Sequence, residues 1–173
     1  MKIAVSGAHR VGKSTLVENL LESLPEYTSR AEAYHELEEQ GHHFSDLPGL
    51  DEFFLQLDYS IEQIAKGGNC TLFDRCPVDI LAYIQLSYAL GHVQNQTLYQ
   101  RVFKAMSTLD LLIFVPIENP DVIACPENEL SELRQRVNEL LHEWVWDFDV
   151  PVLLVSGSAL SRRNQVLQYL SKI

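Results

Sequence analysis

Hydrophobic residues along the chain alternate between short continuous runs and longer stretches with a helical period. The short runs are typical of strands buried in a parallel sheet, and the longer stretches are typical of the helices that connect such strands. We expect strands at Lys2–Ser6, Cys70–Phe73, Leu111–Val115 and Val152–Val155, with a poorly marked fifth strand at Tyr27–Ala31. This alternation predicts one α/β domain over residues 1–173, folded as a three-layer αβα sandwich around a parallel sheet.

The helical stretches lie between these strands. The clearest apolar face runs from Leu50 to Ala65, and the pair Gly67-Gly68 ends that helix. Pro77 stands in the first turn of another helix, where proline is well tolerated. We expect helices over residues 16–24, 35–41, 50–65, 77–90, 96–107, 130–145 and 160–170.

Charge and cysteine content limit the partners and the compartment. The chain has 13 Lys and Arg against 24 Asp and Glu, a formal net charge of −11. Such an acidic surface repels nucleic-acid polymers and anionic lipids, so we expect neither as a partner. We also expect no membrane span and no secretion signal, because no apolar stretch is long enough for either. The three cysteines form no disulfide framework, and a cytoplasmic location is the simplest expectation.

The most specific motif is the glycine-bounded loop after the first strand. Residues 7–14 match G-x-x-x-x-G-K-[ST]. Glycines let the backbone curl so that its N–H groups cradle phosphate oxygens, while Lys13 adds positive charge and Ser14 offers a hydroxyl to Mg²⁺. The motif therefore predicts a nucleotide site. Its candidate binding residues are Gly7, His9, Arg10, Val11, Gly12, Lys13, Ser14 and Thr15.

An acidic residue that serves the metal is expected at the end of a neighbouring strand. Asp74 follows the run Cys70–Phe73, so it is the candidate metal ligand together with Ser14. Asp74 also lies close to the helix that starts at Pro77, so a helix cap is the alternative role. Arg75 adds a cation at the same strand end, where ligands bind in open parallel sheets.

With these motifs the chain resembles P-loop kinases of small metabolites. The likeness rests on Gly7–Thr15, on Leu72–Asp79 and on Val155–Ser158, and the segment at Asp74-Arg75 is similar to a D-R-x-x-x-[SD]-x-x-A-Y pattern. It is greatest to nucleoside and nucleoside-monophosphate kinases, including nicotinamide riboside kinase domains of the bacterial regulator type. An AAA-type ATP-binding domain also fits the loop. The resemblance implies a P-loop NTPase fold with strand order 2-3-1-4-5, bound ATP and Mg²⁺, and an acceptor beside them.

The resemblance also implies a carboxylate after the second strand that orients the acceptor hydroxyl. Glu32 matches that position, and a solvated glutamate in an acidic stretch is the alternative. Related kinases often have an arginine two residues further on, where this chain has Tyr34.

Arginines supply the remaining candidates. The resemblance implies a lid-like segment at about residues 116–136, whose Arg134, or else Arg136, would hold the transferred charge; both can instead be solvated helix residues. Arg162, or else Arg163, would stack on the nucleotide base, although an exposed helix end explains them almost as well.

These features favour an ATP-dependent kinase of a small, nucleoside-like acceptor, acting as a monomer or homodimer. The candidate catalytic residues are Lys13, Glu32, Asp74, Arg75 and Arg134. The main alternative is a nucleotide sensor or regulatory ATPase with little phosphotransfer. A GTPase switch lacks its N-K-x-D and D-x-x-G signals, and the size and acidity of the chain argue against a DNA-acting motor.

Overall fold

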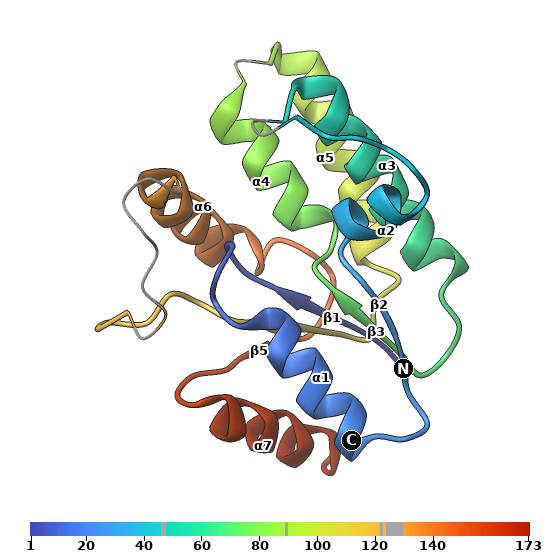
Figure 1. Ribbon diagram of the computed structural model, residues 1–173, viewed down its shortest axis with the longest axis vertical. Helices are drawn as coiled ribbons and strands as arrows, with labels where there is room; N and C mark the ends of the chain where they lie inside the picture. The colour runs from blue at the N-terminus through green and yellow to red at the C-terminus, as the bar shows by residue number, and fades with distance from the viewer. Residues whose placement is uncertain (46–47, 89, 122, 124–129) are drawn as a thin grey trace.

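Five parallel strands form one sheet in the order β2-β3-β1-β4-β5, which confirms the expected topology (Figure 1). The computed structural model describes residues 1–45, 48–88, 90–121, 123 and 130–173. The strands are β1 (Lys2–Ser6), β2 (Thr28–Arg30), β3 (Thr71–Asp74), β4 (Leu111–Phe114) and β5 (Val152–Leu154). The helices are α1 (Lys13–Ser23), α2 (Ala33–Glu39), α3 (Leu50–Lys66), α4 (Pro77–Ser87), α5 (His92–Met106), α6 (Ser131–Trp144) and α7 (Ala159–Leu170).

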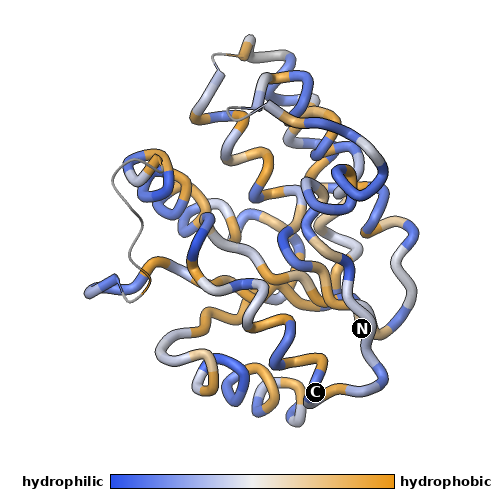
Figure 2. The backbone as a smooth tube through the Cα atoms, in the orientation of Figure 1, coloured by the Kyte–Doolittle hydropathy of each residue, from blue (hydrophilic) through white to orange (hydrophobic). Residues whose placement is uncertain are grey.

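Helices cover both faces of this sheet. In Figure 1, α1 and α7 pack together on one face, and α3, α4, α5 and α6 lie on the other. Helix α4 is central in the second layer, where it contacts α3, α5 and α6. Hydrophobic positions concentrate in the strands and on the helix faces turned toward them (Figure 2). The arrangement confirms the three-layer αβα sandwich.

Burial differs sharply between the strands. Strand β4 is buried at every residue, and β1 is buried from Ile3 onward. Strand β2 lies at the edge of the sheet with all three residues exposed, which explains its weak hydrophobic pattern. Several helix boundaries also differ from the expectation by a few residues: α1 begins at Lys13, α4 ends at Ser87 and α5 begins at His92.

The parallel register brings the carboxyl ends of the central strands to one edge. Val5 of β1 is paired with Asp74 of β3, and Ser6 is paired with Phe114 of β4. The loop after Ser6 therefore begins beside the residues that follow β3 and β4. This edge carries the candidate site.

Two expectations concern features outside the sheet. Residues 122 and 124–129 of the expected lid-like segment lie outside the described residues, and the rest comprises the stretch after β4 and the start of α6. None of the helices in the described part of the chain is long and apolar enough to cross a membrane.

Candidate active site

The loop between β1 and α1 has the backbone of a phosphate-binding turn. Gly7 and Gly12 have φ values of +149° and +86°, which side chains rarely allow. A Cβ atom at Gly7 would lie 2.4 Å from the Val115 carbonyl oxygen, so only glycine fits there. Helix α1 begins at Lys13, directly after the turn, and its N-terminal end therefore faces the loop.

Lys13 lies inside this turn. It is 5% exposed, and its Nζ donates a hydrogen bond to the Ala8 carbonyl oxygen at 2.8 Å. Burial lowers the pKa of Lys13 to about 8, and the nearby Arg75 guanidinium acts in the same direction. Asp79, Glu32 and Asp74 oppose this shift. Lys13 is thus held at the loop, and its pKa is lowered because burial and Arg75 outweigh the neighbouring carboxylates.

A buried carboxylate anchors the start of the loop. Asp79 is completely buried, and its Oδ1 accepts hydrogen bonds from the Ser6 hydroxyl and the Gly7 N–H, both at 2.8 Å. Its Oδ2 accepts from the Cys76 N–H at 2.9 Å and from the Cys76 thiol at 3.3 Å. Asp79 therefore ties the P-loop to the first turn of α4. The sequence analysis gave Asp79 no role, although it matches the [SD] position of the D-R-x-x-x-[SD] pattern and stands at the third helical position after Cys76, where a capping carboxylate is common.

Two arginines bind the outer side of the P-loop. Arg134 is 2% exposed; its Nε donates to the His9 carbonyl at 2.9 Å and its Nη2 to the Arg10 carbonyl at 3.0 Å. Arg162 is 4% exposed, and its Nη1 donates to the Val11 carbonyl at 2.5 Å. The guanidinium groups of Arg134 and Arg162 thus bind three consecutive carbonyls of the loop, those of His9, Arg10 and Val11.

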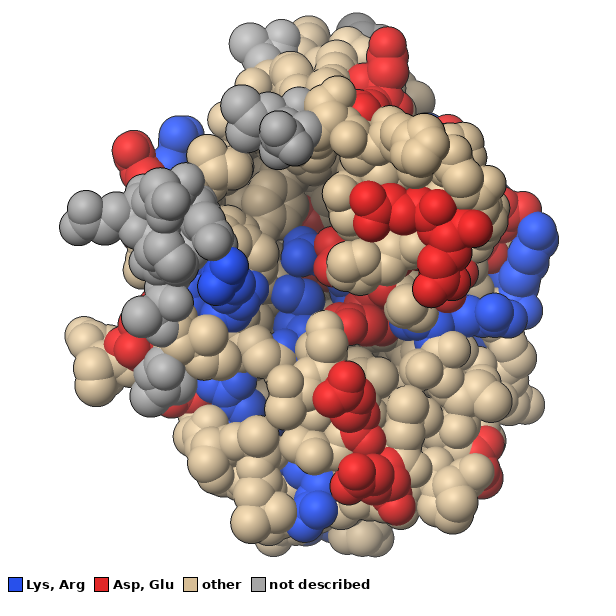
Figure 3. All heavy atoms as spheres, viewed as in Figure 1, with Lys and Arg blue, Asp and Glu red and all other residues tan. Residues whose placement is uncertain are grey.

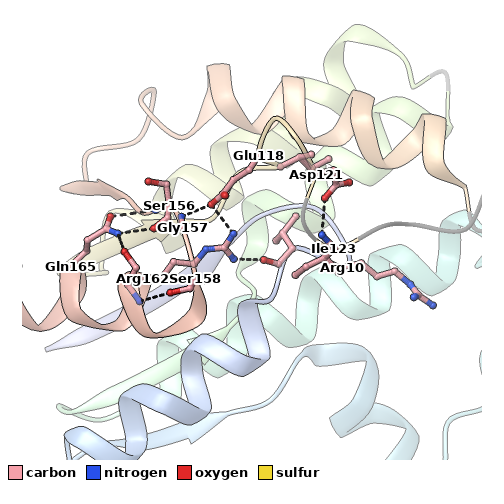
Figure 4. Close-up of polar contacts among 12 residues, drawn as sticks. Arg10, Glu118, Asp121, Ile123, Ser156, Gly157, Ser158, Arg162 and Gln165 are labelled. Carbon is pink, nitrogen blue, oxygen red and sulfur yellow. Dashed lines mark hydrogen bonds and ion pairs between the residues drawn. The ribbon is translucent and has the colours of Figure 1, made fainter.

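Each of these arginines has an acidic partner in the stretch after β4. Asp121 pairs with Arg134 and Glu118 with Arg162, the latter at 2.9 Å, and each arginine holds the pKa of its carboxyl below the ordinary range. Glu118 also accepts the Gly157 N–H at 2.6 Å, so its carboxylate joins the start of α7 to the loop (Figure 4).

The sequence did not indicate that Arg134 and Arg162 bind backbone carbonyls of the P-loop. Roles for Arg134 at the transferred phosphoryl group and for Arg162 at the base stay predictions. Their contacts in this structure hold the loop itself. Of the alternatives, Arg136 is exposed, and Arg163 donates to the side-chain oxygen of the adjacent Asn164.

Across the site, a carboxylate and a guanidinium face the P-loop. Glu32, at the start of α2, has its Oε1 2.7 Å from Nε of Arg75. Burial raises the pKa of Glu32, but Arg75 and then Lys13 outweigh it, so the pKa lies below the ordinary value. Burial likewise lowers the pKa of Arg75, while Glu32 and Tyr83 raise it overall. Both groups are therefore charged at neutral pH.

These groups line one cleft of about 350 Å³. Its walls are formed by His9, Arg10, Gly12, Lys13, Ser14, Thr15, Glu32, Arg75 and Ile123. Figure 3 shows the basic side chains gathered in the hollow, with acidic atoms at its opposite wall. Eight of these nine residues were candidates from the sequence. Two other candidates of the loop do not line the cleft. Val11 is buried in the core, and Gly7, at the start of the loop, is buried beside Val115.

Asp74 and Ser14 fit the requirements of Mg²⁺. Asp74 Oδ1 is buried and has no hydrogen-bond partner among the described residues, and the exposed Ser14 hydroxyl stands at the start of α1. Mg²⁺ commonly takes one or two protein oxygens and completes its shell with phosphate oxygens and water. Over the same residues, no group of three or more His, Cys, Asp or Glu side chains could hold a metal. The helix cap considered for Asp74 is provided by Asp79, since Cys76 is the N-cap of α4.

Solved structures with a similar fold include nucleoside and nucleotide kinases. The chain is similar to a deoxyadenosine kinase from M. mycoides, solved with dCMP and dCDP, at 18% identity over the whole of both chains, with a TM-score of 0.66. It is similar to thymidylate kinase from Candida albicans at 16% identity, covering 99% of this chain and 91% of that one, with a TM-score of 0.67.

A third similar structure is the NadR protein in complex with NAD and AMP-PNP, at 17% identity and a TM-score of 0.68. The match covers 99% of this chain and 48% of NadR, so the chain corresponds to about half of that protein. These likenesses confirm, at the level of the fold, the resemblance to P-loop kinases of small metabolites.

Sequence comparison gives the family. A comparison with curated proteins finds no match. A family model described as AAA domain matches residues 2–163. The match includes the P-loop, the Asp74-Arg75 segment, Arg134 and Arg162. Because that match spans nearly the whole sequence, the chain belongs to the AAA domain family.

Proposed function

We propose that the protein is an ATP-dependent kinase that transfers the γ-phosphoryl group of ATP to a hydroxyl of a small, nucleoside-like molecule. The observation that carries this proposal is the cleft in which Lys13 and the P-loop face the Glu32–Arg75 pair. A phosphate-binding turn opposite a fixed carboxylate supplies both a donor site and a group that can orient a hydroxyl. The fold shared with nucleoside and nucleotide kinases supports the same class of acceptor.

Charge at the acceptor side favours a hydroxyl over a phosphate. Glu32 is ionised and its side chain is 24% exposed to the cleft. A phosphorylated acceptor would bring further negative charge against this carboxylate, whereas a neutral hydroxyl can donate a hydrogen bond to it. Related kinases often carry an arginine at the position of Tyr34. In this chain the Tyr34 ring stacks on Phe44, with ring centroids 4.8 Å apart, and supplies no positive charge for an acceptor phosphate. We therefore propose a nucleoside rather than a nucleoside monophosphate as the acceptor.

The catalytic contribution would come from positioning and charge. Phosphoryl transfer has a loose transition state that demands little basicity of the acceptor, so a carboxylate with a lowered pKa suffices to orient the hydroxyl and receive its proton. Lys13 and the loop N–H groups would bind the phosphates, and Arg75 would hold Glu32 in its ionised form. Ser14 and Asp74 would hold Mg²⁺, which would supply positive charge at the phosphates when bound.

A transfer assay tests the proposal. The protein is incubated with Mg²⁺ and γ-labelled ATP against nucleosides, nicotinamide riboside and nucleoside monophosphates, beside the Lys13→Ala variant. We expect label on a nucleoside-type hydroxyl, and its loss in the variant. Label on monophosphates alone would overturn the acceptor class. ATP binding without transfer to any acceptor would favour the nucleotide sensor.

A further inference from the structure

Tyr83, in the middle of α4, contacts both the P-loop and Arg75. Its hydroxyl oxygen accepts the His9 backbone N–H at 3.1 Å and lies 2.7 Å from Nδ1 of the His9 ring. The centre of its ring lies 5.5 Å from Cζ of Arg75, within range of a cation–π interaction. Phe53 of α3 lies nearly parallel to the same ring, with centroids 6.2 Å apart, and so limits its movement.

These contacts connect segments that are distant in the sequence. His9 belongs to the P-loop after β1, whereas Arg75 follows β3 and pairs with Glu32 at the start of α2. Tyr83 thus stands between the phosphate side and the acceptor side. The hydroxyl binds the loop at His9 and also interacts with the Arg75 guanidinium, and the ring adds a cation–π contact to Arg75. Substitution by phenylalanine removes the hydroxyl contacts and keeps the ring, whereas substitution by leucine removes both.

We propose that Tyr83 is a positioning residue that fixes the distance between the P-loop and the Glu32–Arg75 pair. Its hydroxyl holds the loop at His9, and its ring holds the Arg75 guanidinium against Glu32. The acceptor part rests on the proposed kinase function. The nucleotide part requires only that the P-loop binds ATP, so it can be tested without any acceptor.

The first test measures ATP affinity by calorimetry in the absence of acceptor. Tyr83→Phe removes the hydroxyl and keeps the ring, and we expect the Kd for ATP to rise about five-fold, as for one lost hydrogen bond. Tyr88→Phe is the matched control, because Tyr88 caps the same helix and its hydroxyl donates to the Pro48 carbonyl at 2.7 Å, away from the loop. Equal Kd values for wild type and Tyr83→Phe, or an equal shift in the control, would overturn the loop contact.

The second test separates the ring from the hydroxyl. Tyr83→Leu removes both, and we expect it to raise the KM for the acceptor by about ten-fold, whereas Tyr83→Phe keeps the ring contact with Arg75 and raises that KM less. A general loss of folding would lower kcat in both variants without this difference. Equal acceptor KM values in the two variants would refute the role of the ring.

The ring contact can also be measured without turnover, which keeps this test distinct from the kinase proposal. Tyr83→Leu and Tyr83→Phe are each combined with Arg75→Met, and the unfolding equilibrium of each variant is measured in urea. We expect a coupling of about two- to five-fold in the unfolding constant for the leucine cycle and a smaller one for the phenylalanine cycle, which loses only the contact between the Tyr83 hydroxyl and Arg75. No coupling in the leucine cycle would overturn the ring's part even if no acceptor is found.

Discussion

Arg134 offers the sharpest test of how the P-loop is held. In the variant Arg134→Met, the His9 and Arg10 carbonyls lose two charge-assisted hydrogen bonds. At about 1.5 kcal/mol each, their loss lowers the free energy of unfolding by about 3 kcal/mol. The Asp121 partner is 28% exposed and can be rehydrated, so the loss of this ion pair adds little to the destabilisation. For a chain of this length, the Tm should fall by about 6–12 °C.

The assay is unfolding by urea and by heat without nucleotide, followed by ATP titration. Arg136→Met is the control, because Arg136 is exposed on the same helix and should change stability little. We expect Arg134→Met to lose both stability and ATP affinity, since the loop N–H groups are then less well oriented. If the variant is as stable as wild type but transfers phosphate far more slowly, the guanidinium acts at the reacting group. That result would refute the inference that Arg134 holds the loop through the His9 and Arg10 carbonyls.

Two further predictions concern the loop. ATP affinity should fall about ten-fold per pH unit above pH 8, because Lys13 with a pKa of about 8 loses its charge there; calorimetry from pH 7 to 10 should find proton uptake on binding, and Lys13→Arg should abolish both effects. A pH-independent affinity in the wild type would contradict this. Asp79→Asn should lower the free energy of unfolding, measured in urea, by about 3 kcal/mol. The asparagine amide has one acceptor oxygen, so it cannot accept both from Ser6 and Gly7 and from Cys76 as the two Asp79 oxygens do. Asp110→Asn, which alters an exposed carboxylate that accepts the Lys2 N–H, should cost less, and equal losses would refute the role of Asp79.

Local patterns predicted the parts of the fold that local physics determines. The spacing of residues 7–14 between a strand and a helix located the P-loop, and the run Leu111–Val115 located a strand whose residues are all buried. The same logic gave little at β2, because an exposed edge strand needs no apolar pattern. Strand order followed from the resemblance to a family rather than from the pattern itself.

The contacts that hold the site could not be predicted, because their partners are remote in sequence. Asp79 lies 72 residues from Gly7, and Arg134 lies 125 residues from His9. Arg134 and Arg162 looked like solvent-exposed helix residues or ligand contacts, yet both are buried against backbone carbonyls. A hydrogen bond to a carbonyl leaves no trace in the partner's residue type, so only the three-dimensional structure reveals it.

The most direct test of the proposed reaction separates binding from transfer at Glu32. In the variant Glu32→Gln, the Kd for ATP is measured by calorimetry, and the transfer of γ-label to the acceptor is measured in a single turnover. Glu39→Gln, exposed at the end of α2, is the control. The account predicts that Glu32→Gln binds ATP nearly as well as wild type and transfers phosphate at least about a hundred-fold more slowly. Transfer at the wild-type rate in Glu32→Gln would contradict the proposed role of the cleft.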